Sequence, residues 1–421
     1  MEKGKRIETV NGVINLLPED IILHIQSFLT GREAARAALL SKSWYNAWFT
    51  RPTLEFDEHD FKNYYLNSNP FEEFATKTMQ RYHDLNLKIT SFRLRTYKFT
   101  EKNKLVSHNL IVDAMKIGAT DLKIELPFFE LPPEVLESET LVRLSVTRCN
   151  INVGKLKCSR RLESLSLSNL FIDYRDTIYS GILTLAKLKC LFLERVNVYN
   201  LFFSNFESRF PCLKDLSLVE CQGYTRIEID STSLERLTFV QQNALKAVLD
   251  VPNIRKFSYT SYGLPSLSFK SATSREWESD ISINCRRLQS CSWILSLKRR
   301  LLTKLSTSRI SLSLNRLRFK YDRSDVKAVA KPVVLENLTI DSSSAFSSDL
   351  LLQLFKVCHP KFITHRSKTE GDLLDVSNMS GFMVVKVEVY VMICGEWRLK
   401  KPTDGASTTP VKFCFQLRWG S

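Results

Sequence analysis

Apolar residues near the start of the chain return every three or four positions, which is the period of an amphipathic helix. This pattern predicts three short helices between residues 16 and 50. Pro18 suits the first turn of the first helix. Thr30 and Glu33 form a Thr-x-x-Glu capping box for the second helix, and Ser41 can cap the third. The capping residues therefore support the same division as the apolar spacing.

The third of these helices carries Trp44 and Trp48 four residues apart, so both indole rings lie on one side. A segment of roughly 40 residues rarely buries enough apolar surface to be stable by itself. We therefore expect part of its surface to bind another protein, as an apolar helix face does in a hydrophobic groove. The alternative is that the helices begin an ordinary larger domain.

From about residue 85 the apolar pattern changes to Leu-x-x-Leu-x-Leu, repeated along the chain. The well-marked copies begin 20 to 26 residues apart, within the period of about 20 to 29 residues of a leucine-rich repeat. The copies occupy residues 141–146, 162–167, 188–193, 213–218 and 234–239, and weaker ones occupy 254–259, 288–293, 314–319 and 335–340. Because side chains alternate along a strand, the leucines of each copy must share one face. The pattern predicts an α/β solenoid, a horseshoe with parallel strands on its concave side; a single α/β domain with leucine-rich strands is the alternative.

Other segments fit neither pattern. Residues 71–82 read as a helix that joins the first three helices to the repeats and caps their first unit. Residues 382–393 and 411–419 read as strands, which either cap the array as a hairpin or are loosely ordered. The pattern is poor between Gly263 and Cys285, so the number of repeats there stays open.

The helical segment resembles the F-box. Its sequences Leu-Pro-Glu-Asp-Ile and Leu-Ser-Lys-Ser-Trp-Tyr-Asn-Ala-Trp are similar to the plant form of that motif. In that family the three helices bind a Skp-type adaptor, which links them to a cullin and a RING subunit in the SCF ubiquitin ligase. By this resemblance, the residues that contact the adaptor or form the small core behind those contacts are Leu17, Pro18, Ile21, Ile22, Ile25, Phe28, Leu39, Leu40, Ser41, Trp44 and Trp48.

The segment Leu-Pro-Pro-Glu-Val-Leu through Leu-Val-Arg-Leu-Ser-Val, residues 131–146, is similar to plant F-box/leucine-rich-repeat proteins. The resemblance extends over about residues 13–345. The Cys-Pro-x-Leu-Glu-x-Leu sequence common in that family appears here only as Phe-Pro-Cys-Leu-Lys-Asp-Leu. The expected organisation is a flexible tail (1–12), an F-box (13–58), a helical connector (59–85), a repeat array (86–355) and a C-terminal extension (356–421).

Composition agrees with a folded protein, since 44% of residues are hydrophobic and 25% are charged. No apolar run is long enough to span a bilayer, and the first residues lack the apolar stretch of a signal peptide. We therefore expect an intracellular protein, nuclear or cytoplasmic, with no membrane partner. The ten cysteines form no Cys-x-x-Cys pair, so reduced, buried thiols fit better than disulfides or zinc.

The net charge of +15 is concentrated between Leu295 and Lys331, where eleven Lys or Arg residues accompany two Asp residues. No nucleic-acid-binding motif accompanies this excess, so nucleic acid is an unlikely partner. Exposed cations on the repeats instead suggest a site for an acidic or phosphorylated partner or an anionic small molecule. The candidate residues are Arg236, Lys256, Arg316, Arg318 and Lys320, of which the last three should project from one side of a strand. The alternative is an ordinary solvated strand face.

The chain carries no motif for bond chemistry. The pair Cys358 and His359 does not indicate an activated thiol, and with His365 it is poorly spaced for zinc. We expect no metal, no cofactor and no catalysis by the chain itself. The sequence favours a ubiquitin-ligase substrate receptor that acts by proximity. The alternatives are an F-box/repeat scaffold outside any ligase and, less favoured, a basic nucleic-acid-binding protein.

Overall fold

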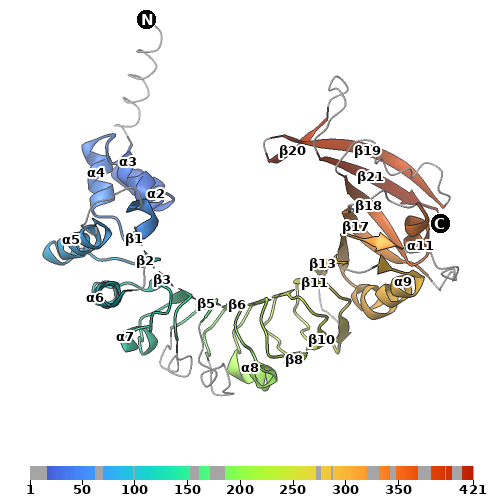
Figure 1. Ribbon diagram of the computed structural model, residues 1–421, viewed down its shortest axis with the longest axis horizontal. Helices are drawn as coiled ribbons and strands as arrows, with labels where there is room; N and C mark the ends of the chain where they lie inside the picture. Colours follow the sequence, from blue (N-terminus) through green and yellow to red (C-terminus); the bar gives the residue numbers. More distant parts are fainter. Residues whose placement is uncertain are drawn as a thin grey trace, which may run out of the picture. The chain divides into compact units, whose positions relative to one another are not determined.

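The structure of the protein is a computed structural model, shown in Figure 1. It describes residues 17–61, 70–97, 100–151, 161–170, 185–271, 276–285, 288–319, 331–341, 348–367, 381–393, 395–400 and 410–420. The chain divides into two compact units, an N-terminal unit (Met1–Val196) and a C-terminal unit (Asn197–Ser421). Among the described residues, no helix combines the length and apolar character needed to cross a membrane.

The three predicted helices are present at the start of the N-terminal unit. They are α2 (Glu19–Ser27), α3 (Gly31–Ala37) and α4 (Lys42–Phe49). The Thr30 side chain accepts a hydrogen bond from the Glu33 backbone N–H, and the Glu33 carboxylate accepts one from Thr30, so the predicted capping box is confirmed. Ser41 caps α4 by accepting the Trp44 backbone N–H across 3.4 Å. The caps predicted at Thr30 and Ser41 are therefore confirmed, whereas Pro18 is the N-cap residue of α2 and precedes the first turn in which the sequence placed it.

Parallel strands follow in the same unit, one from each repeat. Neighbouring strands pair in chain order: β1 (Thr53–Asp57), β2 (Ser91–Arg95), β3 (Asp121–Glu125), β4 (Arg143–Thr147), β5 (Ser164–Ser168) and β6 (Cys190–Glu194). Leu144 lies in register with Leu165, and Leu165 with Leu191, so the buried leucines stack from strand to strand. This stacking confirms the leucine-rich-repeat architecture.

Helices cover the side of this unit opposite the strands (Figure 1). They are η1 (Glu58–Phe61), α5 (Pro70–Asp84), α6 (Glu101–Lys116) and α7 (Pro133–Leu136). Helix α5 contains the predicted connector. Its residues Phe71, Met79 and Tyr82 are buried, so it packs its apolar side against the first repeats as a cap must.

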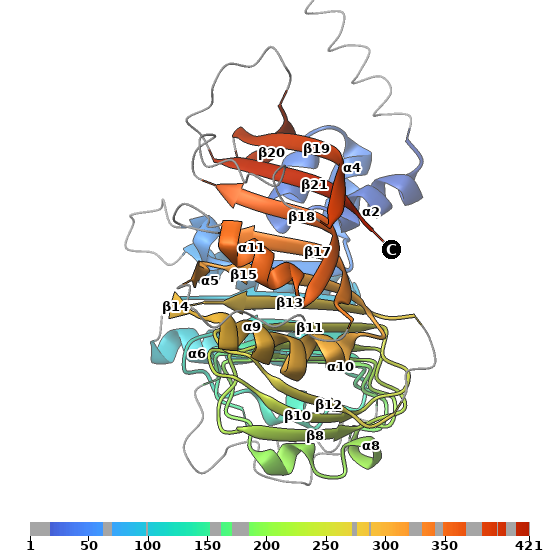
Figure 2. The ribbon, with the colours of Figure 1, turned by 90° about the vertical axis from the view of Figure 1, so that its right-hand side faces the viewer.

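The C-terminal unit contains two layers of strands. One sheet has the order β7 (Asp215–Val219), β9 (Arg236–Val240), β11 (Lys256–Ser261), β13 (Glu278–Asn284), β15 (Arg309–Asn315), β17 (Val333–Asp341) and β18 (Cys358–Ser367), all parallel. A second parallel sheet is made of β8 (Arg226–Asp230), β10 (Lys246–Asp250) and β12 (Ser266–Phe269). Figure 2 shows these as separate layers. Since β7 to β12 alternate between the two sheets, these repeats return through a second strand rather than through a long helix.

Helical pieces pack beside the later strands: η3 (Asn200–Phe203), α8 (Phe206–Arg209), α9 (Cys291–Leu297), η4 (Lys298–Leu302), α10 (Thr303–Leu305) and α11 (Ser348–Phe355). Two of the weaker repeat predictions are wrong. Residues 288–293 enter helix α9, and the strand predicted at 314–319 lies earlier, at β15. Two overlapping patterns in this region fit a strand. One is the alternation of Ile310, Leu312 and Leu314, and the other is the later Leu-x-x-Leu-x-Phe sequence. Only the segment with the alternating pattern joins the main sheet.

The last strands change direction. Next to β18 lie β21 (Val411–Trp419), β19 (Phe382–Ile393) and β20 (Glu396–Leu399), all antiparallel to their neighbours. The strands predicted at 382–393 and 411–419 are thus confirmed, and they extend the sheet beyond its last parallel repeat. A minor pair, β14 (Leu288–Gln289) with β16 (Arg318–Phe319), stands apart from the main sheet.

Candidate protein-binding surfaces

The three helices α2 to α4 separate their apolar residues into a small core and an exposed set. Ile22, Trp44 and Ala47 form the buried core. By contrast, Phe28 is 75% exposed and Leu39 is 88% exposed. We define the exposed apolar set as Ile21, Phe28, Leu39, Leu40 and Tyr45. Large apolar side chains left this open on a helical segment are typical of a protein-binding surface.

The structure thus distributes the eleven residues from the sequence between two roles. Ile21, Phe28, Leu39 and Leu40 are exposed, whereas Ile22 and Trp44 are buried. Leu17, Ile25 and Trp48 are partly buried, Pro18 is exposed before α2, and Ser41 is the cap of α4. Sequence reasoning missed Tyr45, which stacks on Phe49 with ring centroids 5.6 Å apart. The sequence signal for Tyr45 was its position directly after the core residue Trp44, because consecutive residues of a helix point in different directions.

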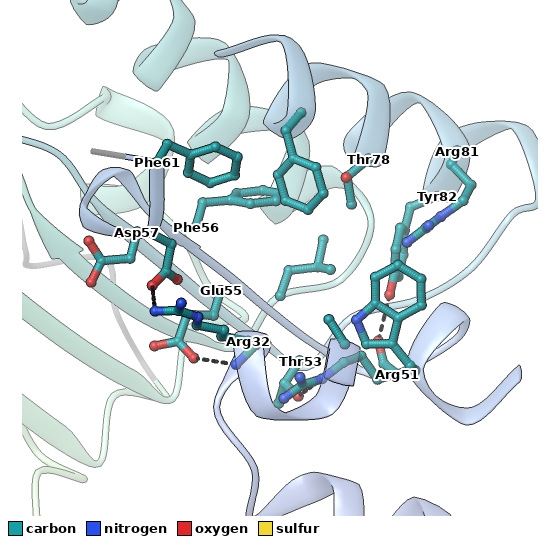
Figure 3. Close-up of a pocket in the computed structure, with 16 residues that line it drawn as sticks. Arg32, Arg51, Thr53, Glu55, Phe56, Asp57, Phe61, Thr78, Arg81 and Tyr82 are labelled. Carbon is teal, nitrogen blue, oxygen red and sulfur yellow. Dashed lines mark hydrogen bonds and ion pairs between the residues drawn. The ribbon is translucent and has the colours of Figure 1, made fainter. Parts of the chain in front are cut away.

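A cavity of about 200 Å³ lies where the helices meet the first strand (Figure 3). Its walls come from α3, α4, β1, η1 and α5. Aromatic rings form much of the lining, among them Phe56 of β1, Phe61 of η1 and Tyr82 of α5. The guanidinium of Arg81 lies 4.2 Å from the centroid of the Phe49 ring, and this cation–π contact joins α5 to α4.

Polar groups in the cavity walls hold the helices to the repeats. The Glu55 carboxylate accepts hydrogen bonds from the Gly31 backbone N–H (3.0 Å) and from Arg93 (2.7 Å). Burial by itself raises the pKa of Glu55, but these two donors outweigh it and the pKa is lowered. Arg51 donates to the Leu29 carbonyl and to the Thr53 hydroxyl, and burial lowers its pKa. These bonds make the cavity a structural junction between α3 and the sheet.

The exposed charges of the N-terminal strands are largely paired with one another. Arg95 lies 3.0 Å from Glu125, and Arg143 lies 2.9 Å from Asp121, each pair bridging neighbouring strands. Farther along, hydroxyl side chains replace the charges, with Ser145 in register with Ser166. The face that carries these side chains therefore changes from charged to neutral along the unit.

Among the described residues, the basic site expected from the sequence is not assembled. Arg236 forms a two-point ion pair with Asp215, and Lys256 pairs with Asp280 across 2.9 Å. The hydrogen bond and charge of Asp280 raise the pKa of Lys256. Acidic residues on adjacent strands, which a linear pattern does not reveal, neutralise both cations.

The other three candidates do not share one strand of the main sheet, so that prediction is wrong. Arg316 has a left-handed backbone (φ 54°) and lies just after the end of β15. Arg318 belongs to β16, which pairs with β14 instead. Lys320 lies outside the described residues.

The residues with possible chemical roles are packed into the fold: Cys358 and His365 are buried, and His359 is half-buried. Burial raises the pKa of the Cys358 thiol to about 12, which opposes thiolate formation. The neighbouring His359 stacks on Trp419, with ring centroids 3.8 Å apart, and burial lowers its pKa. In the described ranges, no three His, Cys, Asp or Glu residues are arranged to hold a metal ion.

Comparisons with known proteins agree with this arrangement. The F-box domain model matches residues 14–55. A putative F-box/LRR-repeat protein of Arabidopsis thaliana is 27% identical over 264 residues, which cover 59% of this chain and 37% of the relative. An F-box/LRR-repeat protein of the same plant is 29% identical over 62% of this chain and 53% of the relative. An FBD-associated F-box protein, also of Arabidopsis thaliana, is 27% identical over 57% of this chain and 60% of the relative. The chain spans about half the length of the curated relatives it matches.

Proposed function

Because this chain carries an F-box followed by leucine-rich repeats, we propose that it is the substrate-recognition subunit of an SCF-type ubiquitin ligase. In this role the F-box binds a Skp-type adaptor, the adaptor connects the chain to a cullin and a RING subunit, and the repeats bind a target protein. The chain acts by bringing the target close to activated ubiquitin, which raises the local concentration of target lysines. It performs no bond chemistry, and it acts inside the cell, in the nucleus or the cytoplasm.

The exposed apolar set on the three helices is the observation that supports adaptor binding most directly. Leu39 and Phe28 leave 88% and 75% of their surface in contact with solvent, although the helices already have a core behind them. Burying one such side chain contributes roughly 1.5 to 3 kcal/mol. A few aliphatic and aromatic anchors of this kind supply most of the binding free energy of a helical interface.

The repeats support target binding by their geometry. Parallel strands present their polar residues in regular rows, as the half-buried Ser217, Thr238 and Ser258 do in the C-terminal unit. The leucines of these strands are buried by stacking on neighbouring repeats. The residues in the polar rows can therefore differ between proteins without loss of the fold. A rigid scaffold with variable polar rows suits a subunit whose task is recognition.

Adaptor binding is tested by Leu39→Glu in the full chain, measured by calorimetry with a purified Skp-type adaptor. A charge in place of an exposed anchor should weaken binding at least about tenfold and leave the melting temperature unchanged. Leu105→Glu is the matched control, because Leu105 is 64% exposed on α6, away from the F-box. Equal affinity of the two variants would refute the proposed adaptor surface.

Ligase function is tested separately from adaptor binding. The chain with its adaptor should bind a neddylated cullin–RING complex and support transfer of ubiquitin to a captured target. A chain that binds the adaptor but recruits no cullin would instead be a scaffold outside any ligase. The same measurement on Leu39→Glu should show loss of both cullin recruitment and transfer.

A further inference from the structure

In the C-terminal sheet of β18, β21, β19 and β20 (Figure 2), strands β18 and β21 have one buried face and one open face. On the outer strand β19 the burial is incomplete, since Val387 lies opposite the buried Phe415 and is 51% exposed. On the buried face, Ile363, Phe413 and Phe415 are at most 3% exposed. Because side chains alternate along a strand, the residues between them point to the other side. That side includes Phe362 and Leu399, which are 39% and 56% exposed. The described residues leave apolar surface on the open face uncovered.

One row across the open face contains two adjacent cations. Arg366 of β18 lies directly opposite Lys412 of β21, and Lys412 lies opposite Tyr390 of β19. Like charges in directly opposite positions destabilise a sheet. Asp341 of β17 flanks Arg366 in the same row, yet the described residues contain no ion pair between the two. The arrangement therefore retains positive charge next to apolar surface.

Besides Asp341, this face carries the carboxylate of Glu388, which already has partners. Glu388 accepts hydrogen bonds from Lys386 (2.6 Å) and from the Tyr390 hydroxyl (3.0 Å). The Lys412 amine lies instead 4.4 Å from the centre of the Tyr390 ring and 5.6 Å from that of Trp397. Aromatic faces attract an ammonium group without cancelling its charge. The rings thus hold Lys412 in place while its charge stays available to a partner.

We propose that this open face, defined by Arg366, Lys412, Tyr390 and Trp397, binds an acidic segment of a target protein. The inference rests on the proposed function, because it names the chemistry of the target that the receptor recruits. Carboxylate side chains of the segment pair with Arg366 and Lys412, and its apolar side chains contact Phe362 and Leu399.

A protein segment fits this face better than nucleic acid does. Among the described residues the open face carries the cations Arg366, Lys412, Arg418 and Lys386. It also carries two carboxylates, Asp341 beside Arg366 and Glu388, which pairs with Lys386. Nucleic-acid binding depends on neutralising many phosphates, on the order of six to ten in a tight complex. A peptide with a few carboxylates needs only the cations present here, and it also uses the exposed Phe362 and Leu399.

The test uses the full chain with its adaptor and a fluorescent peptide in which Glu alternates with Leu and Ser. Its control is the same peptide with Gln in place of each Glu. Fluorescence anisotropy should show at least about fivefold tighter binding of the Glu peptide, and the difference should shrink as salt rises. Arg366→Gln and Lys412→Gln should each remove most of this preference.

Lys361→Gln is the matched control variant, because Lys361 is on the same strand as Arg366 but is paired with Glu336 across 2.8 Å. It should leave the preference for the Glu peptide intact. Equal binding of both peptides, or equal losses in Lys361→Gln and Lys412→Gln, would overturn the proposal. Tighter binding of a single-stranded RNA of similar length would also overturn it. Adaptor affinity, measured on the same variants, should not change, so failure here is distinct from failure of the proposed function.

Discussion

The phenolic hydroxyl of Tyr82 donates a hydrogen bond to the backbone carbonyl of Arg51 across 2.9 Å. Tyr82 is fully buried in α5, and Arg51 lies between the last F-box helix and β1. The bond therefore ties the connector helix to the point where the F-box becomes the repeat sheet. In the N-terminal unit, hydrogen bonds join the F-box to the repeats, and aromatic side chains line the cavity beside them.

Removing this hydroxyl should destabilise the N-terminal unit. Tyr82→Phe keeps the ring but leaves the Arg51 carbonyl without its donor, at an expected cost of about 1 to 2 kcal/mol in the free energy of unfolding. Urea denaturation of the full chain measures it. The exposed Tyr45 provides the control, since Tyr45→Phe removes a hydroxyl that solvent can replace. Comparable losses in both variants would contradict a specific role for the Tyr82 bond.

The Glu55 carboxylate gives the same junction a pH dependence. Its pKa is lowered in the fold because the Gly31 N–H and Arg93 outweigh the effect of burial. A group with a lowered folded-state pKa stabilises the fold above its unfolded pKa of about 4.3, and this contribution is lost as the pH falls through the folded value. Glu55→Gln should cost about 1 kcal/mol at neutral pH, a modest amount because the group is partly exposed to solvent.

Unfolding of Glu55→Gln should be compared with that of the unchanged chain at neutral pH and below about pH 4. The difference in free energy should be largest at neutral pH and should narrow in acid. A difference that stays constant would mean that the charge of Glu55 does not stabilise the junction.

The sequence revealed those parts of the fold that depend on local patterns. The capping box of Thr30 and Glu33 and the strands around Leu144, Leu165 and Leu191 follow from short motifs whose physical cause lies within a few residues. The prediction of a strand at residues 314–319 was wrong because two overlapping patterns there both fit a strand. Only pairing with β13 selects the earlier segment, β15. The strands β8, β10 and β12 of the second sheet do alternate apolar with polar positions, but they lack the Leu-x-x-Leu-x-Leu pattern by which the repeats were recognised.

The candidate sites were less accessible to sequence reasoning because charge pairing occurs between strands. Arg236 and Lys256 looked like free cations, yet Asp215 and Asp280 neutralise them from other repeats. Conversely, Arg366 and Lys412 are 46 residues apart in sequence and meet only through antiparallel pairing of β18 with β21. The register between strands depends on the whole sheet, and it determines which cations lie beside a carboxylate and which do not.

The division of the F-box residues into core and surface leads to a further prediction. Ile22→Ala should lower the free energy of unfolding by about 2 to 4 kcal/mol, because it opens a cavity in a small core. Phe28→Ala should change stability by less than about 0.5 kcal/mol, since the ring is mostly in solvent. Adaptor binding, measured where both variants are folded, should fall clearly for Phe28→Ala. A stable Ile22→Ala would contradict the assigned core.

The cysteines should differ sharply in reactivity. Burial raises the pKa values of Cys149, Cys285 and Cys358 to about 12, so almost no thiolate forms at these positions near neutral pH. Cys212 is exposed. Iodoacetamide at about pH 8, followed by mass spectrometry, should label Cys212 within minutes and the three buried thiols only after denaturation. Rapid labelling of Cys149 in the folded chain would contradict its burial just after β4.

Gly223 occupies a close backbone approach in the C-terminal unit. Its φ of +93° lies in the left-handed region, and a Cβ there would lie 2.8 Å from the Val198 carbonyl oxygen. The approach is fixed by the hydrogen bond from the Val198 N–H to the neighbouring Gln222 carbonyl, 2.7 Å long. Gly223→Ala should therefore cost both the backbone conformation, roughly 1 kcal/mol, and the displacement of a hydrogen-bonded segment.

Gly381 separates these two costs. It has a similar φ of +102°, but a Cβ there would have no atom within 4 Å. Gly381→Ala should lower the free energy of unfolding by only about 1 kcal/mol, and Gly223→Ala should exceed it by at least a further 1 kcal/mol. Urea denaturation of both variants gives the comparison. If the two losses are equal, the contact with Val198 adds nothing, and the tight packing of this repeat against its predecessor is not what makes glycine necessary there.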